Sequence, residues 1–324
     1  MAKSSNANSK PKNGGALAKA KPAPKVAAKK SVRNNKGAEK VISAPKKQSK
    51  SERAKSNMAI TIDVSRKLSD LQASLINAEK LHLQGKLQEA WALYQAILRQ
   101  DPVHYGAIHG MGLIAAQMKS YSMAIDLFNN AIEVDPHNPR AYSNLGNVLA
   151  STGKGALALK SFDKAIKLDP GFVDAIKNRG LVRAEQKQYK TALADFARVL
   201  DLAPSYWRAH IYTANVLISM GKLDKALHAY DLGLAANPNS AALCNNLGAI
   251  LCSLGRFKVA LPKLDRAIKI NPQYAEAFNN RAVALIGLQR PKDALASYDN
   301  ALSIRPGYPD AMKGRAKLQA SMSP

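Results

Sequence analysis

The sequence predicts an all-α fold: an α-solenoid of seven 34-residue helix-turn-helix repeats, preceded by a disordered basic tail and followed by a capping helix. Three periodic rows of residues support this prediction. Prolines recur every 34 residues, at Pro102, Pro136, Pro170, Pro204, Pro238, Pro272 and Pro306. Alanines recur with the same period, at Ala90, Ala124, Ala158, Ala192, Ala226, Ala260 and Ala294. The third row holds only small residues, namely Ala78, Gly112, Gly146, Gly180, Ala214, Gly248 and Ala282. Seven periods without drift indicate one supersecondary unit stacked repeatedly on itself.

The first predicted element is a Lys/Ala/Pro-rich tail over residues 1–57. It holds 16 Lys and Arg against two acids, so +14 of the chain's formal charge of +25 lies there. Large apolar side chains are almost absent, so the segment cannot bury enough surface to offset the entropy of ordering. We therefore expect a disordered basic tail. Its basic clusters fit non-specific binding to nucleic acid or an anionic surface, and they equally fit a solubilising or merely tolerated segment.

The remaining elements follow the 34-residue period. Residues 58–70 are expected to lead into the first helix, with Asp63 or Ser65 as its cap. The seven repeats then occupy residues 71–308, with the boundaries 71–104, 105–138, 139–172, 173–206, 207–240, 241–274 and 275–308. Residues 309–324 match the start of an eighth first helix, so we expect a capping helix that covers the last apolar face. Positions are counted within each repeat, so residue 71 is position 1.

Each repeat is expected to contain two helices packed closely together. The first helix ends near a residue suited to left-handed backbone, for which Gly85, Gly153, Gly221 and Gly255 are candidates. The second helix ends before the periodic proline, where acids such as Asp101, Asp135 and Asp169 are expected to form turns. Small residues let the two helices approach, with Gly146 and Ala158 as one facing pair. The adjoining gaps are expected to be filled by a row of large residues: Tyr94, Phe128, Phe162, Phe196, Tyr230, Leu264 and Tyr298.

This pattern resembles the tetratricopeptide repeat family, whose 34-residue helix-turn-helix unit has small residues at these two positions, an aromatic residue and a late proline. The resemblance covers residues 71–308. It implies a right-handed superhelix whose concave side is lined by the first helix of each repeat. It also implies that partners dock on this concave side, at positions 2, 5, 6, 9, 12 and 13.

A row of asparagines marks the candidate partner-binding residues on the concave side. Position 6 carries four asparagines and one tyrosine, and position 9 adds two more asparagines. The candidates are Asn144, Asn147, Asn178, Tyr212, Asn215, Asn246 and Asn280. Asparagine inside a helix costs up to ~0.7 kcal/mol relative to alanine, so four at one position require an explanation.

Two interpretations of the asparagine row are open. The side chains either hydrogen-bond the adjoining repeat or sit in solvent, or each carboxamide binds the C=O and N–H groups of an extended peptide backbone. The row is similar to the asparagine ladder in the repeat superhelix of O-linked N-acetylglucosamine transferases. Tyr212 interrupts the row at its middle.

The sequence predicts no catalytic site, no metal site and no cofactor. Its six histidines are scattered, and none has a second ligand type at metal spacing. No phosphate-cradling glycine loop and no nucleophile elbow occurs, so we expect neither enzyme activity nor a small-molecule substrate. No stretch of about 20 apolar residues exists that would span a membrane. Cys244 and Cys252 are expected to be buried packing residues in a reducing compartment, and a cytoplasmic protein is therefore expected.

The sequence thus predicts a non-catalytic protein–protein interaction scaffold that binds peptide segments or protein partners on its concave face. Two alternatives remain open. The chain is either the recognition domain of a glycosyltransferase-like system whose catalytic part is absent from it, or a tether to nucleic acid or an anionic surface through residues 1–57. The sequence predicts neither the identity of the partner nor the oligomeric state.

Overall fold

The structure is a computed structural model that describes the backbone of residues 50–322 and the side chains of Met58 and residues 65–322. The chain divides into two compact units, residues 1–58 and 59–324. Residues 1–49 of the predicted basic tail lie outside the described residues, so the prediction of disorder there stays a prediction.

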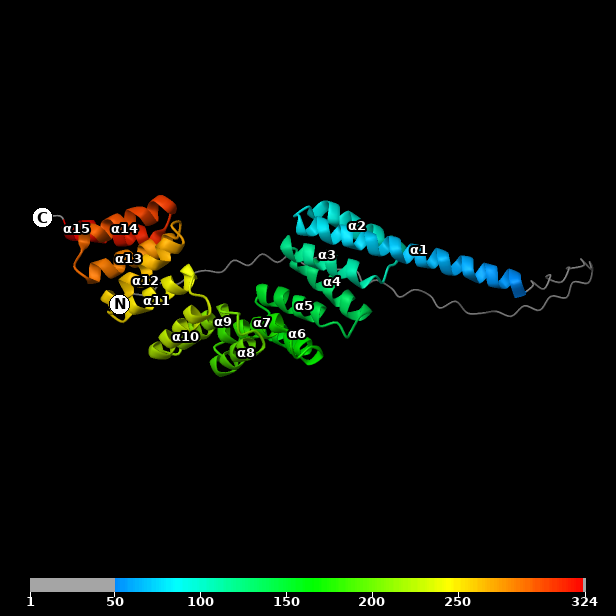
Figure 1. Cartoon of the computed structure of the whole chain (residues 1–324), viewed down its shortest axis with the longest axis horizontal. Coiled ribbons are helices and arrows are strands. Elements are labelled where there is room, and N and C mark those ends of the chain that lie inside the picture. Colours follow the sequence, from blue (N-terminus) through cyan, green and yellow to red (C-terminus); the bar gives the residue numbers. More distant parts are fainter. Residues whose placement is uncertain (1–49, 323–324) are drawn as a thin grey trace, which may run out of the picture. The chain divides into compact units, whose positions relative to one another are not determined.

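Fifteen α-helices and no strand make up the described part of the chain (Figure 1). The helices are α1 (Lys50–Leu83), α2 (Leu87–Gln100), α3 (Tyr105–Gln117), α4 (Tyr121–Val134), α5 (Pro139–Ser151), α6 (Gly155–Leu168), α7 (Val173–Glu185), α8 (Tyr189–Leu202), α9 (Arg208–Ser219), α10 (Leu223–Ala236), α11 (Ala241–Ser253), α12 (Phe257–Ile270), α13 (Ala275–Gly287), α14 (Pro291–Ile304) and α15 (Pro309–Met322). The predicted fold class, an α-solenoid of helix pairs, is confirmed.

The helices stack in chain order. Each first helix packs on the second helix of its own pair and on the second helix of the pair before, as α5 does on α6 and on α4. Neighbouring first helices also touch directly, α3 with α5, α5 with α7, α7 with α9, and α11 with α13. No comparable packing joins neighbouring second helices in the described residues. The first helices therefore line the inner side of the stack, and we call the surface they form at positions 2, 5, 6, 9, 12 and 13 the first-helix face.

Close contact between the paired helices requires the row of small residues. A Cβ atom placed on Gly146 would lie 2.7 Å from Cε1 of Phe162, a side chain with no exposed surface. Gly112 faces Phe128 in the same way. A larger residue at either glycine would push the two helices apart. The large-residue row thus packs directly on the small-residue row, which confirms the packing role of the glycines.

The turns between the helices follow the chemistry that the sequence predicts. The four predicted glycines end their helices with φ between +70° and +76°. Asp101, Asp135 and Asp169 each accept a hydrogen bond at Oδ1 from the N–H two residues ahead, at 2.9–3.3 Å. These bonds confirm the acids as turn formers.

The start of the first helix differs from the prediction. Helix α1 begins at Lys50, so residues 50–57 of the predicted disordered tail and residues 58–70 of the predicted lead-in are helical. The helix runs through Asp63 and Ser65, so the prediction of a cap at either residue was wrong. The physical reason is that no proline or glycine occurs between Pro45 and Gly85, so nothing in the chain stops the helix from extending backwards.

The cysteines and the hydropathy of the helices can be compared with expectation. Cys244 and Cys252 are both free and buried, as expected of packing residues. None of the helices in residues 50–322 has the length and the apolar character required to cross a bilayer.

Candidate partner-binding site on the first-helix face

All seven candidate residues lie on first helices, from α5 to α13. Six of them are half-buried, and Asn215 is exposed. The structure brings one pair of candidates into contact, Asn147 with Asn178. The other five candidates bond or pack mainly with residues that the sequence did not single out.

Three of the asparagines bridge one repeat to the repeat before it. Nδ2 of Asn178 donates to Oδ1 of Asn147 at 2.7 Å. Nδ2 of Asn144 donates to Nε2 of His109 at 2.9 Å, and Nδ2 of Asn280 donates to Oδ1 of Asn245 at 2.9 Å. Position 6 of one repeat thus bonds position 5 or 9 of the preceding repeat. These contacts match the first of the two interpretations, a hydrogen bond to the adjoining repeat.

The row is interrupted at α9. Position 5 there is Ile211, which has no polar side-chain atom, so Asn246 on α11 instead accepts a hydrogen bond from Asn245 at 3.2 Å. Tyr212 packs its ring against Phe196, with ring centroids 5.5 Å apart. Burial raises the pKa of Tyr212, and a hydrogen bond with a neighbouring tyrosine adds to the effect. Tyr212 therefore presents a protonated phenol where the neighbouring repeats present a carboxamide.

The bonds between repeats leave part of each carboxamide unused. A carboxamide has two N–H donors and an oxygen with two lone pairs. Asn144 and Asn178 each use a single N–H in the described residues, and the Nδ2 groups of Asn147 and Asn215 donate to no side chain or backbone there. The inter-repeat bonds hold the side chains in place while the remaining donors and acceptors stay available. Groups fixed before binding cost less entropy when a partner arrives.

A hollow on the first-helix face is lined by residues of α1, α2, α3 and α5. Its volume is about 660 Å³, and its lining residues include Tyr94, Tyr105, His109 and Arg140. Gly110, which occupies position 6 here, has no side chain to fill the space, and the ring of Tyr94 lies directly against it. The ring of Tyr94 thus takes the place that a carboxamide occupies at position 6 of other repeats, and both Gly110 and Tyr94 line the hollow.

Tyr105, one of the residues that line this hollow, carries a hydroxyl group without a partner in the described residues. Its Oη atom is buried and has no hydrogen-bond partner in the described residues. The ring stacks on the His109 ring with centroids 5.4 Å apart and an interplanar angle of 13°. Burial raises the pKa of Tyr105 to about 12, so at neutral pH the phenol keeps its proton and can donate. A buried hydroxyl without a partner costs free energy, which a ligand acceptor would recover.

His109 is held in its neutral form. Its side chain is 7% exposed, and burial, followed by the charge of Arg140, lowers its pKa to about 4. Because Nδ2 of Asn144 can only donate, Nε2 of His109 must be the unprotonated ring nitrogen of this pair. The hydrogen bond and the pKa therefore indicate the same state of the imidazole.

Sequence reasoning missed several residues of this face. Asn245 and Asn279 at position 5 are 5% and 8% exposed and bond the position-6 asparagines beside them. Their signal in the sequence was the Asn-Asn pair repeated 34 residues later. Tyr105 and His109 carried no such signal, because their roles depend on the glycine next to them and on burial. Among residues 50–322, no cluster of three or more His, Cys, Asp or Glu side chains is placed to hold a metal ion.

The comparisons with known proteins agree on a repeat family. Sequence profiles described as tetratricopeptide repeat match residues 139–172, 183–249 and 246–309, and a profile described as TPR repeat matches residues 112–153. No curated protein matches the chain by sequence.

Solved structures resemble the chain in fold. A tetratricopeptide repeat protein from Parabacteroides merdae superposes with a TM-score of 0.60 at 16% identity, covering 77% of this chain and 98% of that one. The pilF protein of Pseudomonas aeruginosa gives a TM-score of 0.55 at 20% identity, covering 66% of this chain and 97% of that one. A structure of the Cut9–Hcn1 hetero-tetramer of the APC/C gives 0.57 at 16% identity, covering 75% of this chain and 48% of that one. At these identities the likeness concerns the fold.

Proposed function

Because the chain belongs to the tetratricopeptide repeat family, whose fold is that of protein–protein interaction scaffolds, we propose that its first-helix face binds an extended peptide segment of a protein partner. Proteins of this family are in general non-catalytic. The bound segment would lie along the first helices from α3 to α13, and at α3, α5 and α7 the face offers both a polar hollow and carboxamides with unused hydrogen-bonding groups.

One observation carries this proposal: Tyr105 lines the hollow of 660 Å³, and its buried Oη has no hydrogen-bond partner in the described residues. Beside it, His109 and Asn144 are already fixed by their mutual bond of 2.9 Å. A second hollow, of about 350 Å³, lies one repeat further along, and Asn147 and Asn178 are among its lining residues. An extended peptide presents backbone C=O and N–H groups at regular intervals and so would meet donors and acceptors in both hollows.

The first experiment selects peptides from a displayed random library on the full chain and measures their affinities for variants. The variant N144A/N178A/N246A/N280A removes four position-6 carboxamides. Each hydrogen bond is worth about 0.5–1.5 kcal/mol. We therefore expect the selected peptides to bind this variant at least about tenfold more weakly than they bind the wild type. The control N129A/N130A/N300A changes exposed asparagines on α4 and α14 and should leave affinity unchanged. Full affinity in the folded quadruple variant would contradict the proposal.

A second variant keeps the test valid if the quadruple variant loses stability with its inter-repeat bonds. Tyr105→Phe removes a hydroxyl that bonds nothing in the described residues, so the free protein should unfold at the same or a higher denaturant concentration. The selected peptides should nevertheless bind several-fold more weakly, because the ligand loses its donor. An unchanged affinity for peptides that protect the α3 amides from hydrogen exchange would exclude the Tyr105 contact.

No specific observation favours the two alternatives drawn from the sequence. The comparisons give no support for nucleic-acid binding, and residues 1–49 lie outside the described residues. The likeness of the asparagine row to that of O-linked N-acetylglucosamine transferases concerns the recognition surface and adds nothing on catalysis.

A further inference from the structure

An ion pair joins position 25 of one repeat to position 7 of the next at three junctions of this solenoid. Asp163 on α6 pairs with Arg179 on α7, with Oδ1 and Nη1 2.7 Å apart. The same two positions are joined at the two last junctions of the chain, where Asp265 pairs with Arg281 at 2.7 Å and Asp299 pairs with Arg315 at 2.5 Å. At other junctions, position 7 is filled by a large buried apolar side chain: Met111, Leu145 or Leu247. At these junctions, a large side chain at position 7 therefore fills the space between successive second helices.

The junction between α8 and α9 has no large side chain at position 7. Position 25 is Ala197 and position 7 is Thr213, so two small side chains replace both members of the ion pair. Neither can reach across the gap that an aspartate and an arginine span elsewhere. The two small side chains leave a space between α8 and α10.

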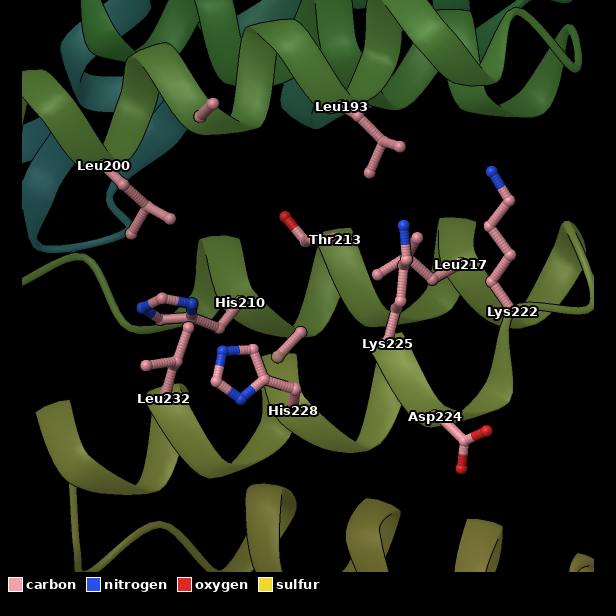
Figure 2. A pocket seen from close by; sticks show the side chains of 12 residues that line it. Leu193, Leu200, His210, Thr213, Leu217, Lys222, Asp224, Lys225, His228 and Leu232 are labelled. Atoms are coloured by element: carbon pink, nitrogen blue, oxygen red, sulfur yellow. The ribbon is translucent and has the colours of Figure 1, made fainter.

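A hollow opens at this junction, on the side of the stack away from the first-helix face. It has a volume of 750 Å³, and Ala197 and Thr213 both line it. Figure 2 shows Leu193 and Leu200 pointing into the hollow from α8, with Leu217 and Leu232 from α9 and α10 completing its apolar walls. Its volume lies within the range of about 300–1,000 Å³ that is usual for small-molecule sites.

The rim of the hollow is cationic. Lys222 and Lys225 extend from the start of α10 towards α8, whereas the carboxylate of Asp224 points away (Figure 2). Asp224 faces Arg256 of the next pair, with Oδ1 and Nη2 3.7 Å apart. Neither lysine ammonium has an ion-pair partner among the described side chains. His228 adds an imidazole ring to the lining, and the carboxylate of Asp224 pairs with Arg256 and not with the two lysines.

We propose that this hollow, which we call the α8–α10 hollow, binds a small amphipathic anion: an aliphatic or aromatic group that carries one carboxylate or sulfonate. The apolar part lies between Leu193, Leu200 and Leu232, and the anionic group pairs with Lys222 and Lys225 at the rim. This site is separate from the first-helix face and does not depend on the function proposed for that face.

The length of the apolar walls favours a small molecule over a docked helix. Leu193 and Leu200 are seven residues apart on α8, which corresponds to about 10 Å or two helical turns. A helix from a partner would contact the hollow over these two turns alone and leave most of its own apolar face in water. A compact amphipathic molecule can bury most of its surface in the same space.

The test uses anilinonaphthalene sulfonate as the probe, because it combines an aromatic body with one anionic group and fluoresces when its surroundings become apolar. The full chain should bind it in a saturable manner with one dominant site. Decanoate should displace the probe. Decyltrimethylammonium has the same tail and the opposite charge, so displacing the probe should require a concentration at least about tenfold higher. Equal competition by the two would contradict the role of the lysines.

The variant A197D/T213R tests the position of the site. It recreates the ion pair found at three other junctions of this chain, so the fold accepts both residues, and it adds no net charge. We expect it to lower probe affinity tenfold or more by filling the hollow, while the melting temperature stays the same or rises. The variant T213S, which keeps the hollow open, should bind as the wild type does. Unchanged probe binding by the folded A197D/T213R chain would overturn the proposal.

A pair of charge variants completes the experiment. K222E/K225E should weaken binding of the probe and of decanoate about tenfold, because two attractive contacts become repulsive. K258E/K292E changes the net charge of the chain by the same amount at exposed lysines on α12 and α14, and should have no such effect. If the two double variants weaken binding equally, the attraction is a property of the whole chain and the assigned site is wrong.

Discussion

At the scale of single residues, His109 makes the stability of the fold depend on pH. Burial lowers its pKa to about 4, against an ordinary value of 6.5. Between these two values the unfolded chain binds a proton that the folded chain does not. The stabilisation is therefore complete above pH 6.5 and is lost progressively as the pH falls towards 4. A shift of this size corresponds to about 3 kcal/mol over the whole interval.

The variant His109→Asn tests this prediction. Asparagine occupies the same position in two later repeats, where Asn245 accepts a hydrogen bond from Asn280, so the bond to Asn144 can be kept. We expect the free energy of unfolding of the wild type, measured in urea at pH 7 and pH 5, to fall by more than that of the variant. The difference should be about 2 kcal/mol, since most of the carboxylates titrate alike in both chains. Equal falls would show that His109 is not the titrating group.

At the scale of helices and turns, every connection within a repeat requires one residue in the left-handed region. Glycine meets this requirement at four connections, but Lys119, Lys187 and Gln289 adopt φ of 58–60° at the other three. Left-handed backbone costs a residue with a side chain about 1–2 kcal/mol. Glycine avoids this cost but loses more conformational entropy on folding, so replacing such a residue by glycine recovers only part of the cost. The backbone of these three residues is therefore strained.

Replacing all three of these residues by glycine should stabilise the chain. We expect K119G/K187G/Q289G to raise the free energy of unfolding by about 1–3 kcal/mol, as measured by urea denaturation. The reverse change Gly153→Ala, at a glycine with φ of 74°, should lower it by about 1 kcal/mol. A loss of stability in the triple variant would mean that the side chains of these residues contribute more than the turn geometry costs.

How much of this architecture the sequence predicts depends on how local each feature is. The glycine turns follow from a fixed period, because each depends on residues within one repeat. The packing partner of Gly146 differs from the prediction, since the ring of Phe162 and not Ala158 lies against it. The bonds of the asparagine row were not predictable in the same way, because they join position 6 of one repeat to position 5 or 9 of another. The α8–α10 hollow depends on two absences, at Ala197 and Thr213, that acquire meaning only when all the junctions are compared.

At the scale of the whole stack, the stability of each repeat depends on its contacts with the neighbouring repeats. Each helix pair contacts its neighbours in the chain and nothing further away in the described residues, so the stack has an end that must be covered. Helix α15 lies on α14 at this end, where Leu318 is 7% exposed and the ring of Tyr298 lies against Gly314. We therefore propose that α15 is the cap expected from the sequence.

Removing α15 should loosen the end of the stack and leave its middle intact. A chain ending at residue 308 would expose Tyr298 and the rest of the apolar surface that Ala311 and Leu318 now cover. Because coupling runs between nearest neighbours, we expect hydrogen exchange to show lost protection in α13 and α14 and wild-type protection in α3 to α6. Leu318→Ala should produce the same local pattern more weakly, at a cost of about 2–5 kcal/mol to the last pair. Protection lost evenly along all the helices would show instead that the stack unfolds as one cooperative unit and that α15 supports the whole of it.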